Sequence, residues 1–173
     1  MLRSRPIYDG HVLDLRVDRI IEPGGIEATR EVVGHPGSVV ILPRRDDGRI
    51  ILVRQYRYPA AKALWELVAG GLEPGETPRA AAHRELREET GYRARHVRSL
   101  LSFYPSPGIL TERMFLVEAL GLTPSEAQPE EDERIRVACF TPAELRRMVR
   151  ARKIHDAKTL VGLMWFLGRF DHP

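Results

Sequence analysis

The first part of the chain is a series of short segments in which apolar and polar residues nearly alternate, or in which apolar residues run together. Both patterns are typical of β-strands when turn residues bound them. The segments span residues 11–20, 28–33, 38–43, 49–56 and 64–68. Glu22-Pro23-Gly24-Gly25 separates the first two and Arg45-Asp46-Asp47-Gly48 the next two. The pattern therefore predicts two hairpins followed by a single strand.

The strongest helix signal covers residues 78–90. Thr77 can cap the first turn through its hydroxyl, Pro78 fits the first helical position, and Gly91 stands where a left-handed residue ends a helix. These three positions predict both ends of the helix.

The second half of the chain continues to mix strands with helices. Strands are expected at 96–103, 114–120 and 135–140, and helices at 142–150 and 157–169. Thr141 and Glu144 have the spacing of a capping box at the start of the first of these helices. The interleaved order predicts one α/β or α+β unit.

The composition suits one globular domain. The chain has 173 residues, of which 43% are hydrophobic and 29% charged, and a chain of this size can bury a substantial core. Cys139 is the only cysteine, which excludes an intrachain disulfide framework and favours a reducing, cytoplasmic location. No segment approaches the roughly 18 apolar residues of a membrane helix, so no membrane partner is expected.

The basic residues are scattered along the chain. Lys+Arg number 27 against 24 Asp+Glu, which leaves a formal net charge of only +3. Nucleic-acid-binding domains usually gather their basic residues into one patch, so nucleic acid is not expected as a partner. Individual arginines remain candidates for binding phosphates, because the planar guanidinium can hold two oxygens at once.

Three carboxylates mark one face of the helix predicted at 78–90. Glu85, Glu88 and Glu89 are three or four residues apart, so they share a face. Taken alone, they fit an ordinary solvated helix surface. The glycine-rich loop 69–76 changes this interpretation, since it can turn backbone carbonyls toward the same carboxylates. Oxygen ligands of this kind suit Mg²⁺ or Mn²⁺.

The loop and the helix together carry a spaced motif. It consists of Gly70, five residues, Glu76, seven residues, and then Arg84-Glu85-Leu86-Arg87-Glu88-Glu89-Thr90-Gly91-Tyr92. With about one chance in fifteen for each residue type, a random chain of this length would show it with a probability on the order of 10⁻⁶. The motif resembles the signature of the Nudix hydrolases, which cleave nucleoside diphosphates linked to another moiety. Tyr92 departs from the aliphatic residue that the family usually has there.

The resemblance implies a fold and a set of metal ligands. The fold is a Nudix α/β/α sandwich with a mixed sheet over residues 37–173, preceded by an N-terminal antiparallel β-hairpin region at 1–36. Glu85 and Glu89 would bind Mg²⁺ or Mn²⁺, with Glu88 close by and the carbonyl of Ala69 as a further ligand. Arg84 would orient these carboxylates through hydrogen bonds.

Flanking segments resemble the ADP-ribose pyrophosphatase branch of the family. The segments are 54–59, 65–71 and 102–108, and Pro107 lies sixteen residues past Gly91. The likeness implies that Arg57 binds a phosphate and that Gly71 and Glu112 contact the substrate. Ser106, Pro107 and Gly108 would line the region of the terminal ribose. The other interpretation of these last three residues is a plain turn between strands.

The acidic stretch before the strand predicted at 135–140 is, taken alone, a solvated charge run. The resemblance places the general base in a loop at this position. Alignment on the following strand favours Glu131 as the base and puts Glu133 near the metal ions, while Glu130 is one residue away from the same role.

The N-terminal hairpin also fits this branch, whose members commonly form homodimers that build each adenosine pocket from both subunits. On that interpretation Arg30 and Glu31 approach the adenine or its phosphate, and His11 and Val12 pack nearby. The simpler interpretation is that these residues only pair strands and face solvent.

Together these inferences predict a metal-dependent hydrolase that cleaves ADP-ribose to AMP and ribose 5-phosphate. Two alternatives stay open. One is a Nudix hydrolase of another nucleoside diphosphate sugar, such as GDP-mannose, or one of broad specificity. The other is a module that binds nucleotide sugars and has no catalytic activity.

Overall fold

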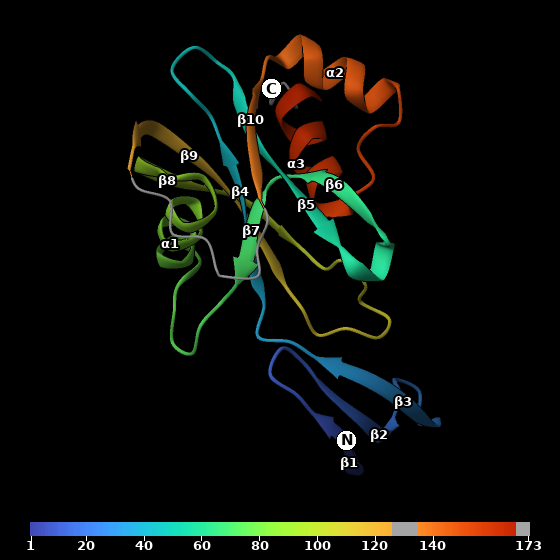
Figure 1. The fold of residues 1–173 in the computed structure, drawn as a ribbon. Helices are drawn as coiled ribbons and strands as arrows, with labels where there is room; N and C mark the ends of the chain where they lie inside the picture. Colours follow the sequence, from blue (N-terminus) through green and yellow to red (C-terminus); the bar gives the residue numbers. More distant parts are fainter. Residues whose placement is uncertain (126–134, 169–173) are drawn as a thin grey trace.

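The computed structural model of the chain describes residues 1–125 and 135–168 (Figure 1). Its strands are β1 (Arg3–Asp9), β2 (Asp14–Ile21), β3 (Glu27–Gly34), β4 (Ser38–Pro43), β5 (Ile50–Arg57), β6 (Lys62–Glu66), β7 (Val68–Gly71), β8 (Tyr92–Phe103), β9 (Met114–Pro124) and β10 (Arg136–Phe140). Its helices are α1 (Pro78–Thr90), α2 (Pro142–Arg150), α3 (Ala157–Gly168) and the short 3₁₀ helix η1 (Tyr58–Ala60). Among the described residues, no helix combines the length and the apolar character needed to cross a membrane.

Two sheets form the body of the molecule. In the larger sheet the strand order is β7-β4-β9-β8, with β4 and β9 parallel and the other two pairs antiparallel. The smaller sheet, β10-β5-β6, is antiparallel throughout. The prediction of a mixed sheet is therefore confirmed.

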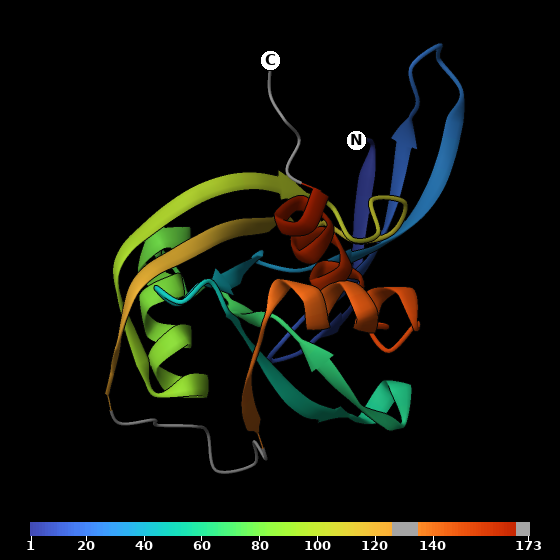
Figure 2. The same cartoon turned by 90° about the horizontal axis from the view of Figure 1, so that it is seen from above.

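The layers are built around β4, all of whose residues are buried. Val39 and Ile41 face a core shared with Leu86 of α1. The intervening Val40 and Leu42 face a second core, to which α2 and α3 contribute. Alternate residues of one strand thus bury against different helices, with α1 on one side of the sheets and α2 and α3 on the other (Figures 1 and 2). This arrangement is the α/β/α sandwich expected from the sequence.

The predicted helix ends are confirmed. The hydroxyl of Thr77 accepts the N–H of Ala80 at 3.2 Å, and Gly91 ends α1 with a φ of 69°. Thr141 and Glu144 form the expected capping box at the start of α2. The helix that carries the acidic motif is therefore fixed at both ends by local interactions.

One prediction about the strands is confirmed but incomplete, and another is wrong. The predicted N-terminal hairpin is formed by β2 and β3, which pair antiparallel, and β1 adds a third strand beside β2. Every residue of β1 is exposed, so no alternation of apolar and polar positions marks that strand. The single strand predicted at 64–68 is divided, because β6 ends at Glu66 and β7 begins at Val68 in the other sheet.

The N-terminal sheet extends away from the body (Figures 1 and 2) and is tied to it at the end of β3. The N–H of Val33 donates to the carbonyl of Ile109 at 2.8 Å, and the N–H of Thr111 donates to the carbonyl of Val33 at 3.0 Å. These bonds connect the N-terminal sheet to the segment between β8 and β9, in which the sequence predicts substrate contacts.

The close packing of α3 on the sheets generates a first prediction. A Cβ added at Gly162 would lie 2.3 Å from Cδ1 of Leu67 and 3.3 Å from Cδ1 of Leu116, both in fully buried side chains. We expect Gly162→Ala to destabilise the protein by about 1–3 kcal/mol through overpacking, measured as a fall in Tm. Gly168→Ala in the same helix is the control, because no atom lies within 4 Å of its added Cβ. Equal Tm values for the two variants would contradict the prediction.

Candidate active site

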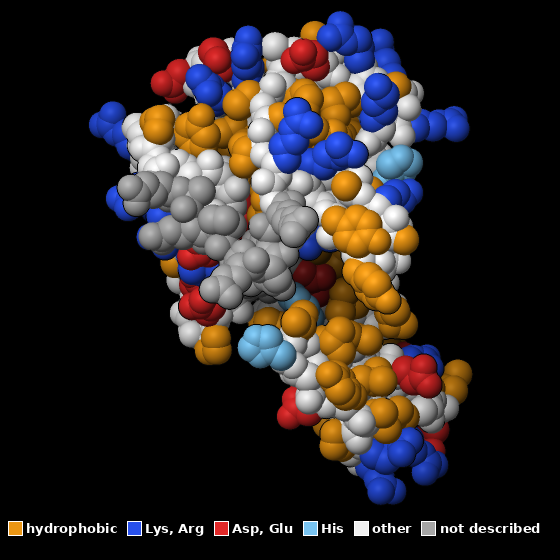
Figure 3. Space-filling view, viewed as in Figure 1, with side chains coloured by type: hydrophobic (Ala, Val, Ile, Leu, Met, Phe, Trp, Pro, Cys, Tyr) orange, Lys and Arg blue, Asp and Glu red, His pale blue; other side chains and the backbone are white. Residues whose placement is uncertain are grey.

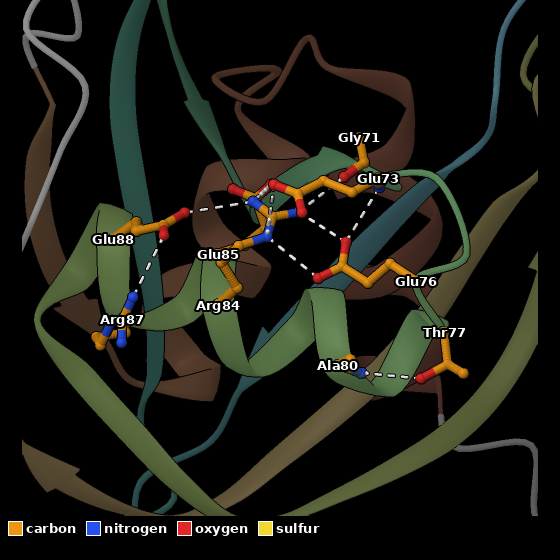
Figure 4. A network of polar contacts seen from close by, with 9 residues as sticks. All are labelled: Gly71, Glu73, Glu76, Thr77, Ala80, Arg84, Glu85, Arg87 and Glu88. Carbon is orange, nitrogen blue, oxygen red and sulfur yellow. Dashed lines mark hydrogen bonds and ion pairs between the residues drawn. The ribbon is translucent and has the colours of Figure 1, made fainter.

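The guanidinium of Arg84 lies at the centre of a polar network on α1 (Figure 4). Its Nε and Nη2 donate to the two carboxylate oxygens of Glu76 at 3.1 and 2.9 Å. Nη1 donates to Glu85 at 2.7 Å and to Glu88 at 3.3 Å, and Nη2 also donates to the carbonyl of Gly71 at 3.0 Å. One side chain therefore joins the loop after β7 to two of the three predicted acidic residues.

Local sequence explains this convergence. Glu76 stands directly before the cap of α1, and its carboxylate also accepts the N–H of Glu73 at 3.1 Å, which folds the loop back on itself. Gly75 adopts a φ of 78°, a conformation that favours glycine at this turn. Arg84 lies two turns into the helix, on the same side as Glu85 and Glu88, so it reaches both the loop and the helix face.

The network also sets the charge state of its members. Hydrogen bonds to Glu76, followed by those to Glu85, raise the pKa of Arg84 well above its ordinary value. Conversely, the hydrogen bonds from Arg84 lower the pKa of Glu76. Arg84 and Glu76 therefore both keep their charges at neutral pH.

Glu85 lies directly against β7. A Cβ added at Gly70 would come within 1.8 Å of Oε1 of Glu85, so the absence of a side chain at residue 70 is what lets the carboxylate reach the strand. Glu89, one helical turn farther along, is only 7% exposed. Glu85 is therefore held where α1 meets the strand that contains Ala69, and Glu89 is buried one helical turn farther along.

These donors fit a hard divalent cation, since carboxylate and carbonyl oxygens are the ligands that Mg²⁺ and Mn²⁺ prefer. Within residues 1–125 and 135–168, no group of three or more His, Cys, Asp or Glu side chains is arranged to hold a metal ion by itself. An ion bound here would take its remaining ligands from the backbone, from water or from a substrate, as Mg²⁺ commonly does.

A second polar cluster surrounds Glu112, which is 9% exposed. Its carboxylate accepts the hydroxyl of Ser38, and Oε1 lies 3.7 Å from Nδ1 of His35. In the sheet register Ser38 is opposite Gly71 on β7 and opposite Met114 on β9. The first residue of β4 therefore brings the Glu112 cluster next to the loop held by Arg84.

The other predicted substrate residues lie in three places. Arg57, at the end of β5, donates through Nε and Nη2 to both oxygens of Glu66 at 2.9 Å. The segment of Ser106, Pro107 and Gly108 forms a turn after β8, in which the carbonyl of Ser106 accepts the N–H of Leu110 at 2.9 Å.

The third place is the N-terminal sheet. His11 and Val12 join β1 to β2 and line a cavity of about 480 Å³ that His35 and Thr111 also border. Arg30 and Glu31 lie on β3 outside that lining. Nη2 of Arg30 donates to Glu22 across the hairpin at 2.6 Å.

Three predicted residues, Glu130, Glu131 and Glu133, lie outside the described residues. Three others were not anticipated by sequence reasoning as part of the site. Glu76 belongs to the motif and could have been found from its spacing, whereas nothing near Ser38 or Glu66 indicates their partners.

Comparison with known proteins identifies the family. The NUDIX domain model matches residues 34–160, more than half of the chain. The chain belongs to the Nudix family. Nudix hydrolases generally use a divalent metal ion, which agrees with the oxygen donors at α1.

Individual Nudix relatives cover nearly the whole chain. An ADP-ribose pyrophosphatase of Bacillus subtilis is 39% identical over 95% of this chain and 90% of its own. An ADP-ribose pyrophosphatase of Mycobacterium tuberculosis is 36% identical over 94% of this chain and 80% of its own. A crystal structure of an ADP compounds hydrolase superposes with a TM-score of 0.83 at 24% identity, covering 97% of this chain and 90% of that one.

The contact between Gly70 and Glu85 generates a second prediction. We expect Gly70→Ala to rotate the Glu85 carboxylate away from β7, so that its 2.7 Å contact with Nη1 of Arg84 is lost. Tm should fall by only a few degrees, equivalent to about 1 kcal/mol or less, because the end of the Glu85 side chain can rotate away from the added methyl group. A crystal structure of the variant and its thermal unfolding test both expectations.

Gly71→Ala is the matched control, since no atom lies within 4 Å of a Cβ added there. Glu85 should keep its contact with Arg84 in this variant. A displaced Glu85 in the Gly71 variant, or an undisturbed one in the Gly70 variant, would show that the approach to residue 70 does not position the carboxylate.

Proposed function

We propose that this Nudix enzyme hydrolyses the pyrophosphate bond of ADP-ribose to give AMP and ribose 5-phosphate, with Mg²⁺ or Mn²⁺ as its cofactor. The observation that carries the chemistry is the Arg84 network, which holds carboxylates together on α1 next to glycine-rich β7. The choice of ADP-ribose is supported by the two relatives named ADP-ribose pyrophosphatase, each aligned over nearly the whole chain.

Glu85 and Glu89 would hold the metal ion, with Glu88 nearby, the carbonyl of Ala69 as a backbone ligand, and Glu133 approaching from outside the described residues. Such an ion neutralises the pyrophosphate and lowers the pKa of a bound water. Arg84 keeps Glu85 and Glu88 oriented, so that the carboxylates are already in position before the substrate arrives.

Substrate binding is assigned to residues on both sides of this centre. Arg57 would bind a phosphate, because it stays charged and lies near the acidic helix: hydrogen bonds to Glu66 are the main cause that raises its pKa, and the charge of Glu89 on α1 adds to them. Gly71 and Glu112 would contact the substrate. Their closeness supports this, because Ser38 is paired with Gly71 in the sheet and donates its hydroxyl to Glu112. Ser106, Pro107 and Gly108 would border the terminal ribose.

The adenosine end is assigned to the N-terminal sheet. The cavity beside His11 and Val12 has the size expected of a small-ligand pocket, and Arg30 and Glu31 on β3 would contribute from the same sheet. Glu131 is proposed as the general base and Glu130 as its alternative, both on the strength of the family resemblance.

We further propose a cytoplasmic homodimer. Eight of the fourteen large hydrophobic side chains that are exposed in the described chain belong to its first 26 residues, and hydrophobic side chains are visible over the N-terminal sheet in Figure 3. An apolar surface of this kind marks an association site more often than a free surface. The lone Cys139 agrees with a reducing compartment.

A product screen tests the activity. Purified protein is incubated with Mg²⁺ and with ADP-ribose, GDP-mannose and other nucleoside diphosphate derivatives, and the products are separated by mass. We expect AMP and ribose 5-phosphate from ADP-ribose, and at least a 100-fold loss in Glu85→Gln, the lower range for loss of a group that acts on the reacting centre.

Each outcome of the screen separates the alternatives. Faster cleavage of GDP-mannose would replace the proposed substrate. Tight binding of ADP-ribose without turnover of any diphosphate would favour the non-catalytic module. Undiminished activity in Glu85→Gln would remove the metal role from that residue.

The dimer is tested by sedimentation velocity. We expect a species of twice the 19.7 kDa chain mass, and we expect Ile7→Glu on β1 to shift it toward monomer, because a buried charge without a partner is costly. Met164→Glu is the control, since Met164 is also exposed but lies on α3. A monomeric wild-type protein would overturn the proposal, as would equal dissociation by both variants.

A further inference from the structure

A buried carboxylate joins two parts of the chain that are 92 residues apart. Glu66, at the end of β6, is 1% exposed. Besides the two hydrogen bonds from Arg57, its Oε2 accepts Nζ of Lys158 at 2.5 Å. A buried carboxylate costs free energy unless it is paired and hydrogen-bonded, and here two cations share one anion.

Lys158 occupies an unusual position for a lysine. It is the second residue of α3, in the first turn, where the helix dipole disfavours a positive charge. Its side chain is only 11% exposed, so solvation does not account for its placement. Two carboxylates compensate for this, because Nζ donates to Asp156 at 2.9 Å and to Glu66 at 2.5 Å.

The strand register shows that Glu66 and Arg57 lie on the face of the sheet that α1 covers. Val53 and Arg57 lie on the same face of β5, because residues four apart on a strand point the same way. Glu66 is the antiparallel partner of Val53, so it shares that face, and Val53 belongs to the core that includes Leu86 of α1. Arg57 therefore continues, at the end of β5, the side of the sheet that α1 covers.

The contacts determine which part of Arg57 is left for a substrate. Nε and Nη2 bind Glu66, and among the described residues Nη1 has no hydrogen-bond partner. The Arg57 side chain is 40% exposed, so Nη1 can reach an anion from solvent. A guanidinium held on one edge presents its other edge in a fixed direction.

Lys158 helps to keep the Glu66 carboxylate ionised, so that it can hold Arg57 in place. Burial raises the pKa of Glu66, but the hydrogen bonds from Arg57 and the charge of Lys158 outweigh that effect and lower it overall. Without Lys158, the carboxylate would lose one of its two cations and the contact that fixes Oε2, so Arg57 would be held less firmly.

We propose that Lys158 is a positioning residue for the reaction, acting through Glu66 to aim Arg57 at the pyrophosphate. This inference rests on the proposed function and extends it to the first turn of α3, outside the acidic motif. Lys158 makes no contact with the substrate on this account, so its effect should pass entirely through Arg57.

A double-mutant cycle tests that dependence. KM and kcat for ADP-ribose with Mg²⁺, and the Kd of ADP-ribose in EDTA, are measured for wild type, Lys158→Met, Arg57→Gln and the double variant. We expect Lys158→Met to raise KM and Kd roughly 5- to 10-fold, within the range of coupling between residues of one hydrogen-bond network, and to change kcat less. In the Arg57→Gln background the same change should have an effect of less than about 2-fold.

Further variants separate positioning from general stabilisation. Lys158→Arg should restore KM and Kd to within about 2-fold of wild type, because it keeps the positive charge. Lys153→Met removes an exposed lysine shortly before α3 and should leave both constants unchanged. Lys158→Gln serves in the cycle if Lys158→Met does not fold, as judged by Tm.

The outcomes distinguish the inference from the function it rests on. Independent effects of Lys158→Met and Arg57→Gln, or failure of Lys158→Arg to restore binding, would overturn the positioning role while wild-type turnover stands. Absence of both turnover and binding of ADP-ribose in the wild-type protein would overturn the proposed substrate and this inference with it.

Discussion

The arrangement of the site depends on one cation among several carboxylates. The carboxylates of Glu76, Glu85 and Glu88 repel one another. On an isolated helix such side chains would turn away from each other into solvent. Arg84 contacts all three and the carbonyl of Gly71. Because the guanidinium is planar and permanently charged, it fixes directions as well as balancing charge. The acidic face is therefore formed before any ion binds.

The strand pairing of the larger sheet brings the second polar cluster, around Glu112, next to the acidic helix. β4 is buried on both faces, and its first residue, Ser38, lies between Gly71 on β7 and Met114 on β9. This register brings the loop of the acidic motif next to Glu112, some 40 residues later in the chain. A shift of one residue would turn Ser38 away from Glu112, so the two polar clusters depend on the same strand alignment.

Local interactions were predictable from the sequence and distant ones were not. The ends of α1 follow from Thr77 and Gly91, which act on their own neighbours. The break at Leu67 does not, because the N–H of that residue donates to the hydroxyl of Thr159, 92 residues away. The exposed strand β1 carries no pattern of its own and is defined by pairing with β2. The acidic motif could be found because its residues are near one another in the chain, and the partners of Arg57 could not.

Buried charge alone does not mark function, as a second carboxylate demonstrates. Glu118 is 2% exposed and, like Glu66, accepts hydrogen bonds from two cations, Arg44 and Arg98. Arg44 follows β4 and Arg98 lies on β8, so this cluster joins neighbouring strands of the larger sheet. Glu66 differs in that one partner belongs to α3 and the other, Arg57, lies on the side of the sheet that α1 covers. The two clusters therefore differ in the elements that their cations connect. Through Glu66, Lys158 in the first turn of α3 is linked to the active site, although the sequence around Lys158 does not indicate this.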